Sequence, residues 1–180
     1  RQAKVLSNLG NLLLEQHQFE AALEHFQRAL ELCIDIEQHR LGGVALANIG
    51  VVQSELGRLD EAMDHLSRAL DKLELAGDER LEAIVFGRLA TLHANRGDIH
   101  QARKTFSLAE IKLKERNERF QLANLYALRG GFEFEGGHLQ HAQAALDNAE
   151  KITKHLSLTP ESEVIRMIRD LREKLSKNTS

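Results

Sequence analysis

Cysteine, proline and aromatic residues are scarce in this chain of 180 residues. Cys33 is the single cysteine, so no disulfide can form within the chain, and a reducing compartment is compatible with it. Pro160 is the single proline, and aromatic residues make up 4% against 28% charged residues, a mix that favours helix. No run of about 18 apolar residues occurs, so we expect no insertion into a membrane.

The sequence also lacks a large excess of positive or of negative charge. The formal net charge is -3 with both signs interspersed, and without a basic stripe nucleic acid is not an expected partner. No signal-peptide pattern occurs, and the expected location is the cytoplasm. Because the sequence starts with Arg1 rather than Met, we expect residues 1–180 to be a single domain excised from a longer protein.

A short pattern of small residues recurs four times with a period of 40 residues. Its first position holds Gly10, Gly50, Ala90 and Gly130, and two later positions hold Ala22, Ala62, Ala102 and Ala142, then Ala29, Ala69, Ala109 and Ala149. A fixed period of this length indicates stacked supersecondary units, which form a solenoid. Such an architecture favours a binding surface over an enzyme.

Each repeat contains two helical patterns separated by a short turn. In the first repeat Val5, Leu6, Leu9, Leu12 and Leu13 recur at helical spacing, and we expect this apolar face to pack inside. The turns fall near 17–18 and at the glycines 57, 97 and 137, because glycine tolerates the left-handed conformation that ends a helix. The predicted helices are 3–16, 19–37, 41–56, 59–76, 79–96, 99–116, 119–136 and 139–156.

Residues 160–176 are predicted to form a capping helix over the last unit. Thr159 is a good N-cap, and Pro160 suits the first helical position. Apolar residues such as Val164, Ile168 and Leu171 alternate with charged ones that suit an outer face. No equivalent polar cap precedes the first repeat, so the N-terminal end is expected to be a cut edge or a contact surface.

The repeat resembles the tetratricopeptide repeat (TPR). Leu6-x-x-Leu9-Gly10-x-x-Leu13, then Ala22, Phe26 and Ala29, carry the pattern, and the second and third copies repeat it. The fourth is weaker, because Arg129 and Glu133 occupy positions that are usually apolar. With 40 residues instead of about 34 and no proline after the second helix, the units are similar to the extended repeats of kinesin light chain, Pins-type scaffolds and bacterial regulators.

The resemblance implies an all-α fold, a right-handed superhelical solenoid of four helix-turn-helix units plus the capping helix. The units would span about 3–37, 41–76, 79–116 and 119–156. It also implies a concave groove, lined mainly by the first helix of each unit, that commonly holds a peptide.

The side of each first helix opposite its apolar face should line this groove. The predicted peptide-binding residues are Lys4, Asn8, Asn11, Asn48, Arg88 and Asn124. Asn8, Asn48 and Arg88 occupy one equivalent position and form a ladder of donors, and arginine can hold a carboxylate by a two-pronged contact. Two plainer interpretations are that Asn48 satisfies a neighbouring backbone group and that Arg88 pairs with Glu55 or Glu118.

The carboxylate-clamp variety of TPR uses lysine, asparagine, asparagine, lysine and arginine at set groove positions. Asn11, Asn48 and Arg88 match the asparagines and the arginine, but Ser7 and Ile84 stand where the lysines belong. The resemblance therefore disfavours binding of a chaperone's C-terminal acidic motif.

Nothing in the sequence predicts an enzyme, a cofactor or a metal site. No nucleophile or phosphate-loop motif occurs, and His138 and His141 lack the further ligands that a metal needs. Arg129 and Glu133 are spaced for a structural ion pair. The leading hypothesis is a scaffold that binds a partner peptide or protein segment in its groove. The alternatives are a sensory or regulatory domain of a larger signalling or transcription-regulating protein, and a homo-oligomer formed through the N-terminal end.

Overall fold

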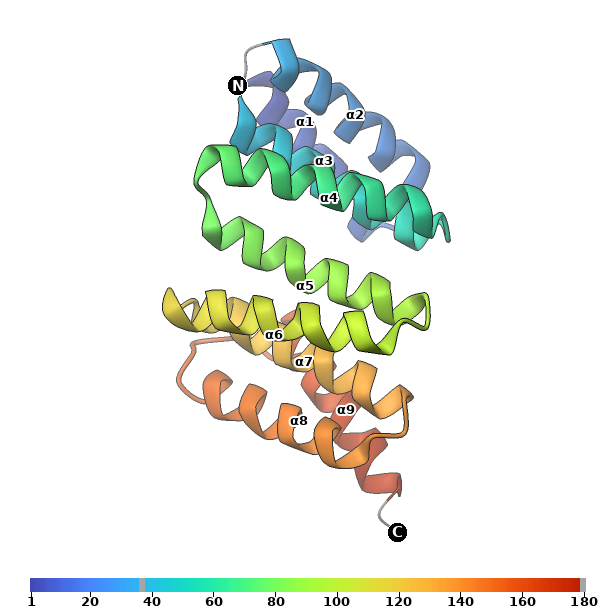
Figure 1. Cartoon of the computed structure of the whole chain (residues 1–180), viewed down its shortest axis with the longest axis vertical. Coiled ribbons are helices and arrows are strands. Elements are labelled where there is room, and N and C mark those ends of the chain that lie inside the picture. Colours follow the sequence, from blue (N-terminus) through green and yellow to red (C-terminus); the bar gives the residue numbers. More distant parts are fainter. Residues whose placement is uncertain (36–37, 179–180) are drawn as a thin grey trace.

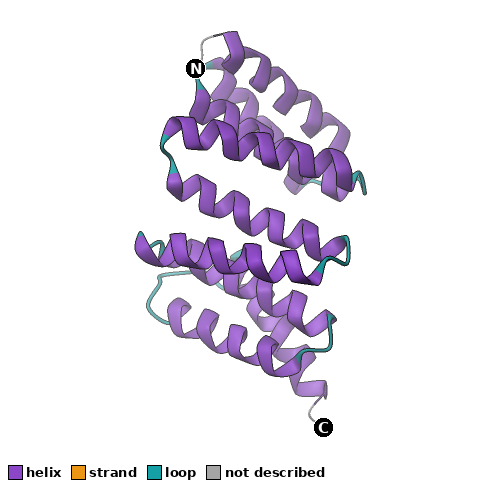
Figure 2. Cartoon of the chain, viewed as in Figure 1, coloured by secondary structure: helices purple, strands orange, loops and turns teal. Residues whose placement is uncertain are grey.

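The computed structural model describes residues 1–35 and 38–178, and within these ranges every regular element is a helix (Figure 2). The helices are α1 (Gln2–Glu15), α2 (Phe19–Asp35), α3 (His39–Glu55), α4 (Leu59–Ala76), α5 (Glu79–Asn95), α6 (Ile99–Glu115), α7 (Arg119–Glu135), α8 (Leu139–Thr153) and α9 (Glu163–Asn178). The predicted all-α solenoid is confirmed. The end predicted for the second helix, residues 36–37, lies outside the described residues.

The helices stack as successive pairs along one axis (Figure 1). Each first helix, α1, α3, α5 or α7, packs against its own second helix, and α2, α4 and α6 also pack against the next first helix. Neighbouring first helices contact one another, whereas no two second helices do so among the described residues. The stack therefore curves, with α1, α3, α5 and α7 on the concave side.

The turns inside the pairs use a left-handed residue, as the glycine positions predicted. Gly57, Gly97 and Gly137 have φ of 74°, 77° and 76°. In the first unit, whose turn contains no glycine, His17 takes this conformation with φ of 58°. The amide of the following residue bonds back into the helix, for example Arg58 N–H to the Gln53 carbonyl at 2.8 Å, which satisfies a helix-end carbonyl.

The small residues of the repeat permit close contact within each pair. A Cβ atom added at Gly50 would lie 2.8 Å from Cγ of Leu66 and 3.2 Å from the carbonyl oxygen of Ala62. At Gly10 it would lie 2.6 Å from the ring of Phe26. Ala62 is itself fully buried. The period seen in the sequence is therefore a packing requirement.

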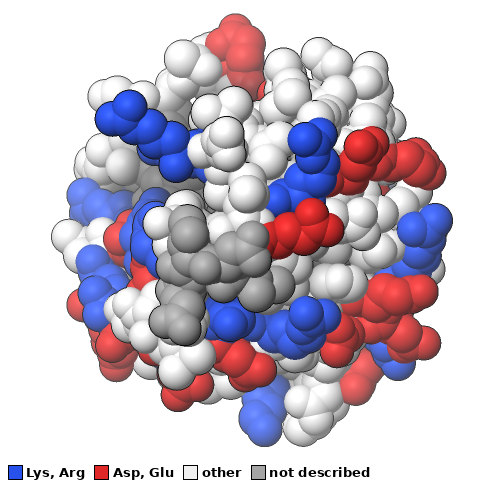
Figure 3. Space-filling view, turned by 90° about the horizontal axis from the view of Figure 1, so that it is seen from above, with Lys and Arg blue, Asp and Glu red and all other residues white. Residues whose placement is uncertain are grey.

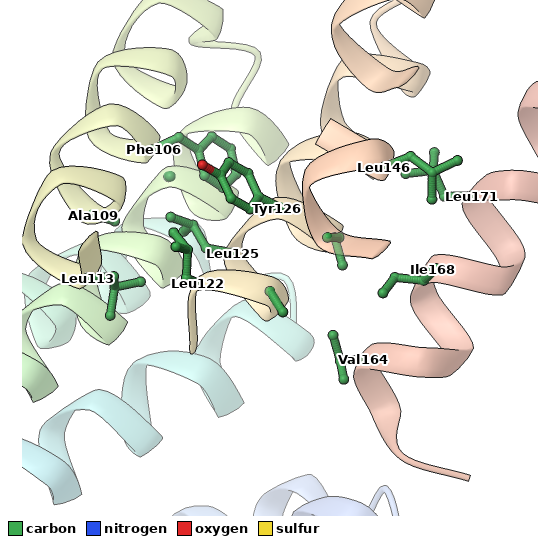
Figure 4. Packing of buried hydrophobic residues seen from close by; sticks show 14 of the residues in the cluster. Phe106, Ala109, Leu113, Leu122, Leu125, Tyr126, Leu146, Val164, Ile168 and Leu171 are labelled. Carbon is green, nitrogen blue, oxygen red and sulfur yellow. The ribbon is translucent and has the colours of Figure 1, made fainter. Parts of the chain in front are cut away.

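Helix α9 caps the last unit, as predicted. Val164, Ile168 and Leu171 point from α9 toward α7 and α8 and join the core that contains Leu125 and Leu146 (Figure 4). The helix begins at Glu163, later than the predicted residue 160, because Pro160 occupies a turn. In this turn the amide and the hydroxyl of Ser162 both donate to the carbonyl of Thr159, at 3.1 and 2.9 Å.

The interpretation of Arg129 and Glu133 as an ion pair with each other was wrong. Arg129 pairs with Glu110 at 3.0 Å, and the fully buried Glu133 accepts two hydrogen bonds from Arg103, at 3.0 and 2.6 Å. Burial alone would raise the pKa of the Glu133 carboxyl, but the hydrogen bonds and charge of Arg103 hold this pKa below its ordinary value. Both pairs fasten α7 to α6.

The apolar face predicted for the first helix is only partly buried. Leu6 and Leu13 are half-buried between α1 and α2, but Val5, Leu9 and Leu12 are 64%, 40% and 50% exposed. The expectation that all five pack inside was wrong, because α1 is apolar on two adjacent sides and the described residues cover only one of them.

Candidate functional site

A hollow of about 490 Å³ lies on the concave side of the stack. Its walls come mainly from three first helices: Gly50, Val51, Ser54 and Glu55 of α3; Ala83, Ile84, Gly87, Arg88, Thr91 and Leu92 of α5; and Phe120, Gln121, Asn124, Leu125 and Leu128 of α7. Leu14, Leu66, Leu113 and Glu163 complete it. We refer to this hollow as the groove.

Arg88 is the single Lys or Arg residue among those that line the groove. Its Nη1 donates to the carbonyl of Ala47 and to Oδ1 of Asn48, each at 3.3 Å. Among the described residues, Nε and Nη2 have no hydrogen-bond acceptor, and no carboxylate forms an ion pair with this guanidinium. Burial lowers the pKa of Arg88, an effect that the charge of nearby Glu163 opposes.

Asn48 positions this arginine. It is 7% exposed, and its Nδ2 donates to Oδ1 of Asn11 at 3.1 Å while its Oδ1 accepts from Arg88. The three side chains form a hydrogen-bonded row across α1, α3 and α5. Both groups of the Asn48 amide are thus used by side chains inside the protein, not by the neighbouring backbone group of the plainer interpretation, and Asn48 does not line the groove.

The remaining predicted binding residues divide into two groups. Asn124 lines the groove from α7. Lys4 and Asn8 are exposed on α1 and do not line it, and the row of hydrogen bonds contains Asn11 where the sequence indicated Asn8. The alternative in which Arg88 pairs with Glu55 or Glu118 is not seen among the described residues, and Glu118 pairs with Arg80 at 3.2 Å. The structure brings Asn11, Asn48 and Arg88 together and leaves Lys4 and Asn8 outside.

Sequence reasoning missed two residues that shape the groove. Phe120 is 43% exposed and lines it, at a position where the two preceding units carry Arg40 and Arg80. This replacement of a charged residue by an aromatic one was the available signal. Glu163, at the start of α9, also lines the groove, and no repeat pattern could place it because α9 lies outside the repeats.

The described residues do not form a binding site for a metal ion. They contain no group of three or more His, Cys, Asp or Glu side chains able to hold a metal ion. The rings of His138 and His141 lie 6.2 Å apart at their centroids. Cys33 is buried, and burial raises the pKa of its thiol. None of the described helices is long and apolar enough to cross a membrane.

The family comparison agrees with the repeat pattern. Residues 1–75, which hold α1 to α4, match the model of the tetratricopeptide repeat family. Residues 1–75 therefore belong to the TPR family. The matched region covers the first two units, and α5 to α8 repeat the same helix pairs with the same small residues at their contacts. No curated protein matches the sequence.

Solved structures share the fold at low sequence identity. BtubC (BKLC) from P. vanneervenii is 18% identical with a TM-score of 0.71, over 89% of this chain and 68% of that one. RapI in its apo form is 21% identical with a TM-score of 0.71, over 97% and 69%. A putative kinesin light chain from Podosopora anserina is 12% identical with a TM-score of 0.61, over 99% and 96%. At these identities the likeness establishes the helical-repeat fold alone.

Proposed function

We propose that this TPR domain is a protein-interaction module that binds a partner segment in the groove, with Arg88 as the contact for a carboxylate of that segment. The observation that carries the proposal is the state of Arg88. The half-buried guanidinium has no carboxylate in direct contact, only the more distant charge of Glu163, and two of its nitrogens remain to donate to an anion.

The rest of the groove fits a polypeptide. Ile84, Phe120 and Leu128 provide apolar surface for side chains, and Asn124 offers both a donor and an acceptor for a peptide backbone. Gly87 also lines the groove, where a Cβ atom would lie 3.1 Å from Cδ1 of Leu125, so glycine lets α5 and α7 approach closely beside Arg88. Glu55 and Glu163 are also among the lining residues, where they favour a cationic group of the same segment.

A displayed library of random peptides, selected on the purified domain, tests the proposal. We expect the selected peptides to contain Asp or Glu. Binding of one such peptide, measured by fluorescence anisotropy, should weaken at least about tenfold in Arg88→Ala, since a charge-assisted hydrogen bond is worth roughly 1.5–3 kcal/mol. Arg88→Lys should recover part of the loss, because it keeps the charge without the planar fork.

Arg68→Ala is the matched control. Arg68 lies on α4 outside the groove and pairs with Asp64 at 3.2 Å, so its loss should leave peptide binding unchanged. Phe120→Ala removes apolar contact surface without touching the Asn48 row and should also weaken binding. Thermal melts confirm that each variant is folded. Equal affinity in Arg88→Ala and in the unsubstituted domain would refute the proposal.

A further inference from the structure

An exposed apolar strip runs along α1. It consists of Val5, Leu9 and Leu12, which are 64%, 40% and 50% exposed and lie on one face of the helix at i, i+4 and i+7. Three adjacent residues of this kind on one helix form a patch rather than scattered surface residues. We refer to them as the α1 strip.

The residues that lie 40 and 80 positions after this strip show what such a surface contacts in the later units. The equivalent residues are Ala45, Ile49 and Val52 in α3, and Val85, Leu89 and Leu92 in α5, and all six are at most 6% exposed. They are covered by the second helix of the preceding unit: Ile49 and Val52 pack with Ala22 and Phe26 of α2, and Leu89 and Leu92 with Leu66 and Leu73 of α4. The α1 strip is therefore a stacking surface of the solenoid that no described helix covers.

Among the residues that the structure describes, the opposite end of the stack offers no matching surface. Helix α9 buries its apolar residues against α7 and α8, and the residues that it exposes include Arg166, Arg169 and Asp170. Head-to-tail association, which would join the α1 strip to this end, is therefore disfavoured. A contact between the α1 strips of two chains buries both strips. Because neither strip then stays exposed, the assembly stops at two chains.

The charges at the two ends of α1 favour one relative orientation of two packed α1 helices. Arg1 and Lys4 are exposed at the start of α1, and Glu15 is exposed at its end. In an antiparallel arrangement the basic first turn of one copy faces the acidic last turn of the other, which the helix dipoles also favour. A parallel arrangement would place like charges together. Seen from the end that carries α1 and α2, uncharged residues fill much of the surface, with basic and acidic residues both near its middle and around its rim (Figure 3).

We propose that the α1 strip is a homodimer interface, in which α1 packs antiparallel against α1 of a second copy of this chain. Val5 of one copy then lies beside Leu12 of the other, with Leu9 near the twofold axis. The interface is separate from the groove, because none of these three residues lines it. Its failure would therefore leave the proposed peptide binding untouched.

Light scattering across a wide range of protein concentrations tests this proposal. The mass should rise from 20.3 kDa toward twice that value and go no further. Leu9→Glu should raise the dissociation constant about 10-fold or more, because it removes a buried leucine and places two carboxylates near the axis. Ile111→Glu is the matched control: Ile111 is 53% exposed on α6, outside the strip, and its change should leave the dimer intact.

Cysteine cross-linking tests the orientation. Val5→Cys combined with Leu12→Cys should give an oxidised dimer, whereas Val5→Cys alone should not, and the native Cys33 is buried and should not interfere. A constant mass of one chain at every concentration would overturn the proposal. So would a dimer that survives Leu9→Glu, a mass that grows beyond two chains, or efficient cross-linking by Val5→Cys alone.

Discussion

Single residues decide how closely the paired helices approach. Gly50 is the clearest case, because the space for its missing Cβ is taken by Leu66 and by a backbone oxygen of Ala62 that cannot move aside easily. Gly131, in α7, has nothing within 4 Å of the corresponding point. Two glycines inside helices of one protein therefore differ in purpose, and only the one at Gly50 is a packing requirement.

Alanine at these two positions should have opposite effects on stability. Gly50→Ala should lower the free energy of unfolding, because an overpacking cost of about 1–3 kcal/mol exceeds or offsets the gain in helix propensity of about 1 kcal/mol. Gly131→Ala should raise the free energy of unfolding by about 1 kcal/mol, because it gains helix propensity without an overpacking cost. Urea denaturation of both variants measures the difference, and a Gly50→Ala variant more stable than Gly131→Ala would contradict the packing account.

Ion pairs between helices and ion pairs within one helix differ greatly in burial. Arg103 binds the carboxylate of Glu133, whose side chain is fully buried, whereas Arg68 and Asp64 are 52% and 61% exposed on one helix. Arg103→Ala leaves a buried carboxylate without its partner and should cost about 1–3 kcal/mol. Arg68→Ala should cost at most about 1 kcal/mol. Equal losses of free energy of unfolding in the two variants would contradict the importance of burial.

The same ion pair makes stability depend on pH. The folded pKa of Glu133 lies below the unfolded value of about 4.3, so the ionised carboxylate stabilises the fold above that pH, and this contribution is lost as pH falls through the folded pKa. Above about pH 5, Glu133→Gln should be less stable than the unsubstituted protein. In acid the difference in free energy of unfolding between the two proteins should become smaller. Urea denaturation at several pH values measures this difference, and a difference that stays the same in acid would contradict the role given to Glu133.

At the scale of elements, the sequence predicted the helices well because their signals are local. Apolar periodicity and the glycines at 57, 97 and 137 placed the turns, and the structure has them there. The start of α9 was misplaced because Pro160 is acceptable both in a first helical turn and in the turn that precedes it. Sequence pattern alone does not separate these two uses of proline.

At the scale of the whole molecule, the groove could be predicted only in part. Two of the predicted residues, Arg88 on α5 and Asn124 on α7, line the groove, because the same side of the first helix recurs from unit to unit. Asn48 was harder to interpret, since its hydrogen bonds to Asn11 and Arg88 depend on the distances between stacked helices. The sequence alone could not distinguish the α1 strip from core residues, because the residues at the equivalent positions of the second and third units are buried in the core.

The central claim is that a partner segment occupies the concave side of the curved stack. Isotope-labelled protein titrated with a selected peptide tests it directly, by mapping which backbone amide signals shift in NMR spectra. We predict that the largest shifts cluster on α3, α5 and α7, around Val51, Arg88 and Asn124, and that Arg88→Ala abolishes them at the same peptide concentration. Shifts that cluster on α2, α4 and α6 would contradict the claim, because these helices form the convex side.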